Sequence, residues 1–190
     1  MYSVQSEPFF GYDTRCREID TAFFLQVSKR TGTTPLAIEP TQSIWKDGKL
    51  IPWQDAQVHV LSHALHYGTS VFEGIRCYKT SEGRAIFRLD DHIRRLLDSA
   101  KIYRFPVPFS QQELTAACRD VIVDNDLESA YIRPLVYHGY GSLAVLPSAE
   151  MTPEVIVAAI RWGAYLGEEG LRNGIDVCVS SWNRKIGIAH

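Results

Sequence analysis

The pair Asp47-Gly48, within the stretch SIWKDGKLIPW, constrains the fold of this chain more than any other short feature. Two short runs of alternating apolar and polar residues flank the pair. Asp-Gly between such runs is typical of a two-residue β-hairpin, because both turn positions need a positive φ angle that these residues tolerate. The sequence therefore predicts an antiparallel hairpin at this point.

The segments that follow predict a mixed α and β fold. GIRCYKT and AIFRL, on either side of the turn SEGR, indicate a second hairpin. Two amphipathic helices come next: LDDHIRRLLDSAKIYRF, with Asp90 as its predicted N-cap, and SQQELTAACRDVIVDNDL, which opens with the capping box Ser110 and Glu113. AYIRPLVYHG, PEVIVAAIRW and GIDVCVSSW are expected to be strands, and Pro134 in the first predicts an edge strand or a bulge. This order predicts an α+β module followed by the opening of a second sheet.

The composition is that of a soluble globular protein, with 45% hydrophobic and 22% charged residues among 190. Such a chain buries roughly 70% of its unfolded surface, which is enough for a core. The net charge of -2, without blocks of like charge, argues against a nucleic-acid surface. The apolar stretch TAFFLQV is too short to span a membrane. We expect reduced thiols and no bound metal, because no metal-ligand spacing links the four cysteines, Cys16, Cys77, Cys118 and Cys178.

Two glycines and two aromatic residues lie close together in SHALHYGTSVFEGIR. Glycine lets a backbone approach a ligand closely, and aromatic rings form the walls of apolar pockets. Gly68 and Gly74, with Tyr67 and Phe72, therefore fit either a ligand pocket or a tight turn packed on the core. The pattern leaves both interpretations open.

Arg95 lies opposite the apolar stripe of its predicted helix, at 100° per residue. The neighbouring Arg94 fits an exposed face equally well. Either both arginines are solvated surface residues, or Arg95 reaches into a cleft against a second domain. In the second case its planar guanidinium suits a phosphate group.

Tyr131 and Arg133 share one face of the strand predicted for AYIRPLVY, because side chains alternate along a strand. An arginine beside a tyrosine suits recognition of a carboxylate, and it suits a salt bridge at the rim of the sheet equally well. RWGAYLG adds Trp162 and Tyr165 around two glycines. These two residues fit a pocket wall or a corner of the core.

Five motifs between Thr41 and Arg184, in order and without large gaps, resemble one known family. They are HALHYGTSVFEGIRCY, DSAKIYRFP, AYIRPL, WGAYLG and SSWNR. Together they are similar to the bacterial branched-chain amino-acid aminotransferases, which are class IV, pyridoxal 5'-phosphate-dependent enzymes of fold type IV. The resemblance implies an α+β, class IV aminotransferase-like small domain followed by the first strands of an incomplete large domain.

The resemblance also assigns roles to the positions left open above. It implies that Arg95 holds the cofactor phosphate and that Arg133 receives the distal carboxylate of glutamate or 2-oxoglutarate. Leu143 and Val145 match an interdomain loop that reaches a neighbouring subunit's pocket, which implies a homodimer or an assembly of dimers. The full set of implied substrate-binding residues is Tyr67, Phe72, Gly74, Tyr131, Arg133, Leu143, Val145, Trp162 and Tyr165.

The lysine that forms the Schiff base in this family lies downstream of SSWNR, beyond the last residue of this sequence. Lys185 directly follows Arg184 and does not occupy the aligned position. Without that amine there is neither a covalent anchor for the cofactor nor a base at the reacting carbon. We therefore expect no catalytic residue on this chain, weak cofactor binding, and no turnover by the chain alone.

The implied reaction transfers an amino group between L-leucine, L-isoleucine or L-valine and 2-oxoglutarate, in branched-chain amino-acid biosynthesis. Two alternatives stay open: a non-catalytic module that dimerises with or regulates a full-length enzyme, and D-amino-acid aminotransferase or aminodeoxychorismate lyase chemistry on the same fold. Residues 1–40 are expected to be a disordered extension, residues 41–160 the small domain, and residues 161–190 an interdomain segment and the start of a truncated large domain. We expect a cytoplasmic protein with neither nucleic-acid nor membrane partners.

Overall fold

A computed structural model describes residues 38–148, 151–161, 170 and 172–174 of the chain. Nearly all of these residues belong to one compact unit, Ile38–Tyr165. The extension predicted for the first forty residues lies almost wholly outside the described residues, and so does the strand predicted for GIDVCVSSW. The domain boundaries near residues 40 and 160 stay predictions.

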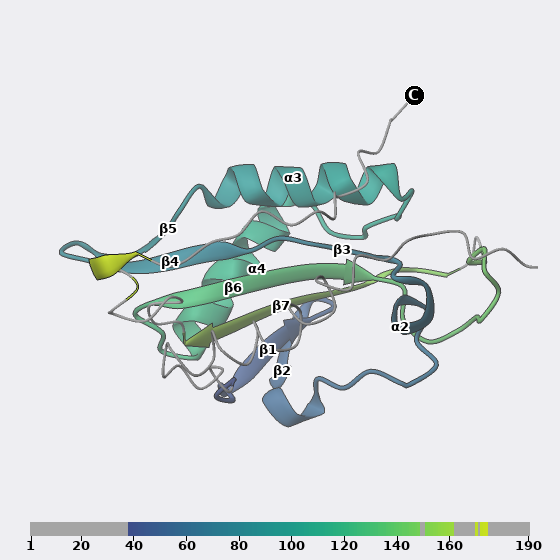
Figure 1. The fold of residues 1–190 in the computed structure, drawn as a ribbon, viewed down its shortest axis with the longest axis horizontal. Helices are drawn as coiled ribbons and strands as arrows, with labels where there is room; N and C mark the ends of the chain where they lie inside the picture. Colours follow the sequence, from purple (N-terminus) through teal and green to yellow (C-terminus); the bar gives the residue numbers. More distant parts are fainter. Residues whose placement is uncertain (1–37, 149–150, 162–169, 171, 175–190) are drawn as a thin grey trace, which may run out of the picture. The chain divides into compact units, whose positions relative to one another are not determined.

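The described unit consists of one antiparallel sheet with helices packed against it (Figure 1). Hydrogen-bonded neighbours follow the order β2-β1-β7-β6-β4-β5, and β3 also pairs with β6. The strand bounds are β1 Ser43–Lys46, β2 Lys49–Pro52, β3 Ser70–Phe72, β4 Ile75–Thr80, β5 Gly83–Ile86, β6 Ala130–Tyr137 and β7 Glu154–Arg161. Because β1 pairs with β7, the two ends of the described unit meet inside the sheet. The predicted α+β class is confirmed.

Both predicted hairpins are present. In the first, Lys46 pairs with Lys49 across Asp47 and Gly48, whose φ angles are 45° and 96°. Positive φ at both central positions is what a two-residue turn requires to match the twist of its strands. In the second, β4 and β5 pair up to Thr80 and leave two residues in the turn. Local turn chemistry therefore decides these two elements.

The second of the two long helices, α4 (Gln111–Asp124), begins as predicted. The Ser110 hydroxyl accepts a hydrogen bond from the Glu113 N–H, and the Glu113 carboxylate accepts one from the Ser110 N–H. This reciprocal pair satisfies two donors that a helix start leaves open. Within the described part of the chain, no helix has the length and apolar character needed to cross a bilayer.

The first long helix, α3 (Leu89–Ile102), begins two residues earlier than predicted. Asp90 is not its N-cap, because Arg88 occupies that position with a φ of 46°. Asp90 lies in the first turn instead, where its carboxylate accepts a hydrogen bond from the Thr115 hydroxyl of α4. A carboxylate there still favours the helix, because the N-terminal end of the helix dipole is positive.

Helices α3 and α4 contact each other on one face of the sheet. α4 contacts β1, β6 and β7, and α3 contacts β3, along which it lies in Figure 1. The apolar stripe predicted on α3 is directed into this core, although Leu97 is only partly buried. Fully buried members from both layers are Ile75, Ile93, Leu96, Leu114, Val121, Ile132, Val136, Val155 and Val157.

The strand that contains Pro134 is central, so the prediction of an edge position is wrong. β6 pairs with β7 along one side and with both β3 and β4 along the other. The Pro134 carbonyl accepts a hydrogen bond from the Glu73 N–H, at the break between β3 and β4. The N–H and C=O of one strand residue point to the same side of the strand. The N–H that Pro134 lacks would therefore also point at this break, where no ladder hydrogen bond is lost. A proline is therefore tolerated in the middle of the sheet.

Three short elements had no sequence signal strong enough to predict them. They are the 3-10 helix η1 (Trp53–Asp55), the helix α2 (His63–Tyr67) and β3. α2 ends at Gly68, which has a left-handed φ of 66°, and its backbone N–H closes the turn. Elements of three to five residues are too short to show a period, so tertiary contacts decide them.

Candidate functional site

Strand alternation places four of the predicted substrate residues on the face of the sheet away from α3 and α4. In β6, Ile132 is buried in the helix-side core, so Tyr131 and Arg133 project from the opposite face. Phe72, at the end of β3, and Gly74, just after it, alternate in the same way with buried neighbours. The structure therefore brings Phe72, Gly74, Tyr131 and Arg133 together.

Arg133 is held by both aromatic residues of this group. Its Nη2 donates a hydrogen bond of 2.6 Å to the Tyr131 hydroxyl. Its guanidinium carbon lies 4.2 Å from the centre of the Phe72 ring and 5.1 Å from that of Tyr131. Cations are attracted to aromatic faces at such distances, so the rings orient the guanidinium without neutralising its charge.

Gly74 leaves the space that the Tyr131 hydroxyl occupies. A Cβ atom at this position would overlap Tyr131 Oη and lie 3.0 Å from Cζ, too close for any side chain without a shift. Its φ angle is not in the left-handed region, so space and not backbone conformation requires glycine here. Gly74 thus accommodates Tyr131, and its role in substrate binding stays a prediction.

Two buried donors on this face have no hydrogen-bond partner within the described part of the chain. They are the Nε atoms of Arg133 and of Arg76, whose strand position pairs directly with Tyr131. Buried donors are almost always satisfied, so each exception needs an explanation. Two half-buried arginines among aromatic rings can bind a ligand that has both a carboxylate and apolar groups.

Arg95, on α3, projects from the helix layer and not from the substrate face. Its Nε and Nη2 donate to the two oxygens of Glu73, a carboxylate that is only 5% exposed. His92 Nδ1 lies 2.9 Å from the same carboxylate. Burial would raise the pKa of Glu73, but hydrogen bonds and charge from Arg95 and His92 outweigh it and hold that pKa below its ordinary value. Glu73 is thus an ionised, buried anchor for Arg95.

One short segment connects the two arginine clusters. Phe72, Glu73 and Gly74 are consecutive, and their directions alternate across the sheet. Phe72 stacks on Arg133 and Gly74 accommodates Tyr131 on one side, whereas Glu73 binds Arg95 on the other. A change in the backbone of this segment therefore affects both clusters.

Tyr67 and Leu143 form a second group at the C-terminal end of β6. The Tyr67 hydroxyl donates a hydrogen bond of 2.8 Å to the Leu143 carbonyl. His63 of α2 also contacts the loop that holds Leu143 and Val145, because its Nε2 lies 2.8 Å from the Ala144 carbonyl. The side chains of Leu143 and Val145 are 46% and 80% exposed. Tyr131 and Arg133 lie toward the other end of β6. Within the described residues, no contact joins the loop of Leu143 and Val145 to these two side chains.

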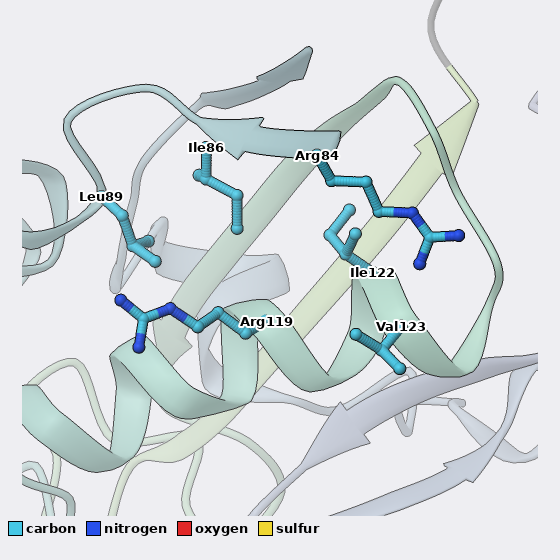
Figure 2. A pocket seen from close by; sticks show the side chains of 6 residues that line it. All are labelled: Arg84, Ile86, Leu89, Arg119, Ile122 and Val123. Atoms are coloured by element: carbon cyan, nitrogen blue, oxygen red, sulfur yellow. The ribbon is translucent and has the colours of Figure 1, made fainter. Parts of the chain in front are cut away.

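Trp162 and Tyr165, the two remaining predicted substrate residues, lie outside the described residues. A pocket of about 390 Å³ opens elsewhere, between β5, the start of α3 and α4 (Figure 2). Figure 2 shows the guanidinium groups of Arg84 and Arg119 at opposite ends, with Ile86 and Ile122 between them. None of the predicted site residues lines it, and Arg84 is paired with Asp126.

The sequence reasoning missed Glu73, His92 and Arg76. A signal for Glu73 was present, because it falls in phase with the buried Val71 and Ile75 on alternating positions. A charged residue on the buried phase of a strand predicts a cationic partner. His92 and Arg76 carry no comparable signal, since their neighbours come from segments distant in sequence.

Comparison with known proteins shows the family of this chain. The profile of the family "Amino-transferase class IV" matches residues 70–186. The branched-chain-amino-acid aminotransferase of Escherichia coli (strain K12) is 60% identical over 141 residues, which are 74% of this chain and 46% of that protein. The corresponding protein of Pseudomonas aeruginosa is 50% identical over the same share of each chain.

Solved structures give the same relationship. A crystal structure of the Escherichia coli branched-chain amino acid aminotransferase superposes with a TM-score of 0.74 at 59% identity, over 76% of this chain and 47% of that one. The T.th. branched-chain amino acid aminotransferase complexed with N-(5'-phosphopyridoxyl)-L-glutamate gives a TM-score of 0.65 at 49% identity, over 68% and 42%.

The antiparallel sheet with two helices on one face superposes on these solved aminotransferases, and the family profile covers more than half of the chain. This chain belongs to the class IV aminotransferase family. It spans about half the length of the curated relatives it matches, with 46% of the Escherichia coli protein covered.

Proposed function

We propose that this chain carries the substrate-recognition and phosphate-binding residues of a branched-chain amino-acid aminotransferase. The reaction transfers the amino group between L-leucine, L-isoleucine or L-valine and 2-oxoglutarate. The observation that supports this most is the Tyr131–Arg133 pair, which presents a guanidinium without a carboxylate partner among the described residues inside an aromatic, half-buried face. The sequence identity of 60% to an enzyme of that name supports it further.

Such an enzyme must accept a branched apolar side chain in one half-reaction and a carboxylate in the other. Arg133 can bind the carboxylate of glutamate or 2-oxoglutarate, while Phe72 and the ring of Tyr131 contact an aliphatic chain. The T.th. relative has been solved with a phosphopyridoxyl-glutamate and with 4-methylvaleric acid, one ligand of each kind. The same two demands explain why an arginine lies among aromatic rings here.

The described residues also fit pyridoxal 5'-phosphate. Arg95 is 66% exposed on its side chain, and its Nη1 makes no hydrogen bond among the described residues, so it can donate to a phosphate. When bound, the cofactor supplies the electron sink for removing the proton from the substrate's α-carbon. This chain's own residues bind and orient: Arg95 the phosphate, Arg133 the distal carboxylate, and the Tyr131 hydroxyl a polar group of the substrate.

A homodimer or an assembly of dimers is part of the proposal. Its support is the loop that follows β6, where Leu143, Val145 and Leu146 expose 46%, 80% and 83% of their surface. Exposed apolar residues gathered on one loop suit contact with another subunit. A cytoplasmic location is proposed as well, since Cys77 and Cys118 are free, buried thiols.

The test compares two ligands on two variants. In Arg133→Met, the aliphatic stem stays while the charge and its hydrogen bonds go. Loss of hydrogen bonds to a charged partner should weaken 2-oxoglutarate binding about tenfold or more. Binding of 4-methylvaleric acid should change less than about twofold, because its aliphatic end does not need Arg133. Both affinities are measured by NMR titration of the 190-residue chain.

Arg84→Met is the matched control, because it makes the same substitution at an arginine that is paired with Asp126 on the edge strand β5 and is none of the proposed site residues. It should leave both affinities unchanged. Equal weakening of both ligands by Arg133→Met would contradict the proposed division of roles.

A further inference from the structure

Glu73 is a carboxylate where the fold expects an apolar side chain. It lies in the buried phase of the strand, between Val71 and Ile75, and is only 5% exposed. Burying an ionised carboxylate is unfavourable unless it is paired and hydrogen-bonded. The presence of Glu73 therefore needs a partner whose placement matters.

Arg95 is that partner, and the contact has the geometry of a fork. Arg95 Nε donates to Oε1 at 2.5 Å, and Nη2 donates to Oε2. His92 Nδ1 lies 2.9 Å from Oε2 and donates to it, because a carboxylate can only accept. With Nδ1 protonated in this way, the 3.3 Å approach of Arg95 Nη2 to His92 is a contact and not a hydrogen bond.

The fork fixes the plane of a guanidinium that is otherwise free to move. Two parallel hydrogen bonds give such a pair geometric specificity as well as energy. They use one edge of the guanidinium and leave Nη1 on the other, within a side chain that is 66% exposed. An exposed arginine without this anchor would lose rotamer freedom only when a ligand binds.

We infer that Glu73 is a positioning residue, which holds Arg95 so that its free edge is presented to the phosphate of the cofactor. This inference rests on the proposed function, in which Arg95 binds that phosphate. Glu73 itself touches neither phosphate nor substrate. His92 supports it by binding the same carboxylate oxygen from one helical turn earlier on α3.

The direction in which Glu73→Gln changes the anion affinity distinguishes a positioning role of Glu73 from a purely electrostatic effect of its charge. Glu73 carries a negative charge beside the phosphate site, so removing that charge should by itself tighten anion binding. If Glu73 positions Arg95, its removal should weaken anion binding despite the more positive potential. The two accounts predict opposite directions for Glu73→Gln.

The experiment measures binding of inorganic phosphate and of pyridoxine 5'-phosphate to the 190-residue chain by NMR titration. Pyridoxine 5'-phosphate carries the ring and phosphate without the aldehyde that labels lysines. Glu73→Gln should weaken both ligands about fivefold to tenfold. Arg95→Lys, which keeps the charge but cannot form the fork, should weaken them at least as much. Arg94→Gln is the matched control, because Arg94 is 64% exposed on the same helix and is paired with Asp91 rather than Glu73, and it should have no effect.

The outcomes separate the two proposals. Unchanged or tighter binding by Glu73→Gln, together with weaker binding by Arg95→Lys, overturns the positioning role and leaves the phosphate role of Arg95 standing. No effect of Arg95→Lys overturns the phosphate role itself. Circular dichroism and thermal unfolding check that each variant is folded.

A measurement on the unsubstituted chain covers the case in which Glu73→Gln does not fold. The Nε–H proton of Arg95 should exchange with water at least about tenfold more slowly than that of Arg94, because it is bound to a buried carboxylate. Arginine-selective nitrogen-15 NMR measures both rates. Equal exchange rates would show that the fork does not hold Arg95 and would overturn the inference.

Discussion

Arg95 and Arg133 lie on opposite sides of one three-residue segment, and they are bound in opposite ways. Arg95 is neutralised by the buried carboxylate of Glu73. Among the described residues Arg133 has no carboxylate partner, and it is held by the Tyr131 hydroxyl and the Phe72 ring. Both are oriented, but of the two only Arg95 has a carboxylate partner within the described part of the chain.

This difference matches what each arginine is proposed to bind. A cofactor phosphate stays in place, so a permanently paired and rigid Arg95 suits it. A substrate carboxylate is present in only one half-reaction, so Arg133 must tolerate its absence beside an apolar chain. Aromatic rings suit this need, because they attract the guanidinium but, unlike a carboxylate, do not neutralise its charge. If both proposed roles hold, the helix-covered face serves permanent binding of the cofactor and the opposite face serves intermittent binding of the substrate carboxylate.

The largest expected effect tests the division of the sheet into a structural face and a ligand face. Ile132 is fully buried under the helices, whereas its neighbour Tyr131 projects from the other side. Ile132→Ala should lower the free energy of unfolding by about 2–5 kcal/mol, through lost burial and the cavity left behind. Tyr131→Phe should cost less than about 1.5 kcal/mol, since it keeps the ring and removes only the hydroxyl that bonds Arg133. Urea unfolding measures both, and equal losses would contradict the division.

A smaller effect is expected where the two clusters share backbone. Gly74→Ala should displace the Tyr131 hydroxyl, which the new Cβ atom would overlap, and with it the contact to Arg133. We expect 2-oxoglutarate binding to weaken about tenfold, while phosphate binding changes less than about twofold. NMR titration with each ligand separates them. Equal losses of both would show that the substitution disturbs the whole 72–74 segment.

The acid response of the chain should report on Glu73. Its pKa in the folded chain lies below the ordinary value of 4.5, despite its burial, because Arg95 and His92 stabilise the charged form. Its stabilising contribution is therefore fully present above about pH 4.5 and is lost as the pH falls through the lower folded pKa. Glu73→Gln should flatten the pH dependence of stability in that acid range only. Urea midpoints between about pH 3 and pH 7 test this, and an unchanged slope would contradict it.

The smallest effect concerns a thiol of the helix-covered face. Cys118 is fully buried in α4, and burial raises its pKa to about 12. A neutral thiol without solvent access is unreactive, so it should be alkylated at about pH 8 only as fast as the chain unfolds. Mass spectrometry of the Cys118 peptide follows the reaction. Rapid alkylation without denaturant would show that this face is open to solvent.

Much of this molecule follows from short-range chemistry in the sequence. The Asp47-Gly48 turn, the Ser110–Glu113 capping box and the stripe of α3 were predictable because each depends on residues within a few positions of one another. The alternation of Tyr131 and Arg133 was predictable for the same reason. Asp90 was misassigned because a carboxylate suits both the N-cap and the first turn, and the local pattern does not separate these positions.

Pairing between distant segments decided the rest. Pro134 lies in a central strand because the partner strand breaks opposite it at Glu73, which no pattern within β6 reveals. Glu73 could be recognised in the sequence as a charge in a buried phase, but its partner Arg95 is 22 residues away. Side-chain period and turn chemistry are local properties, whereas the choice of partner across a sheet depends on how the whole chain closes its core.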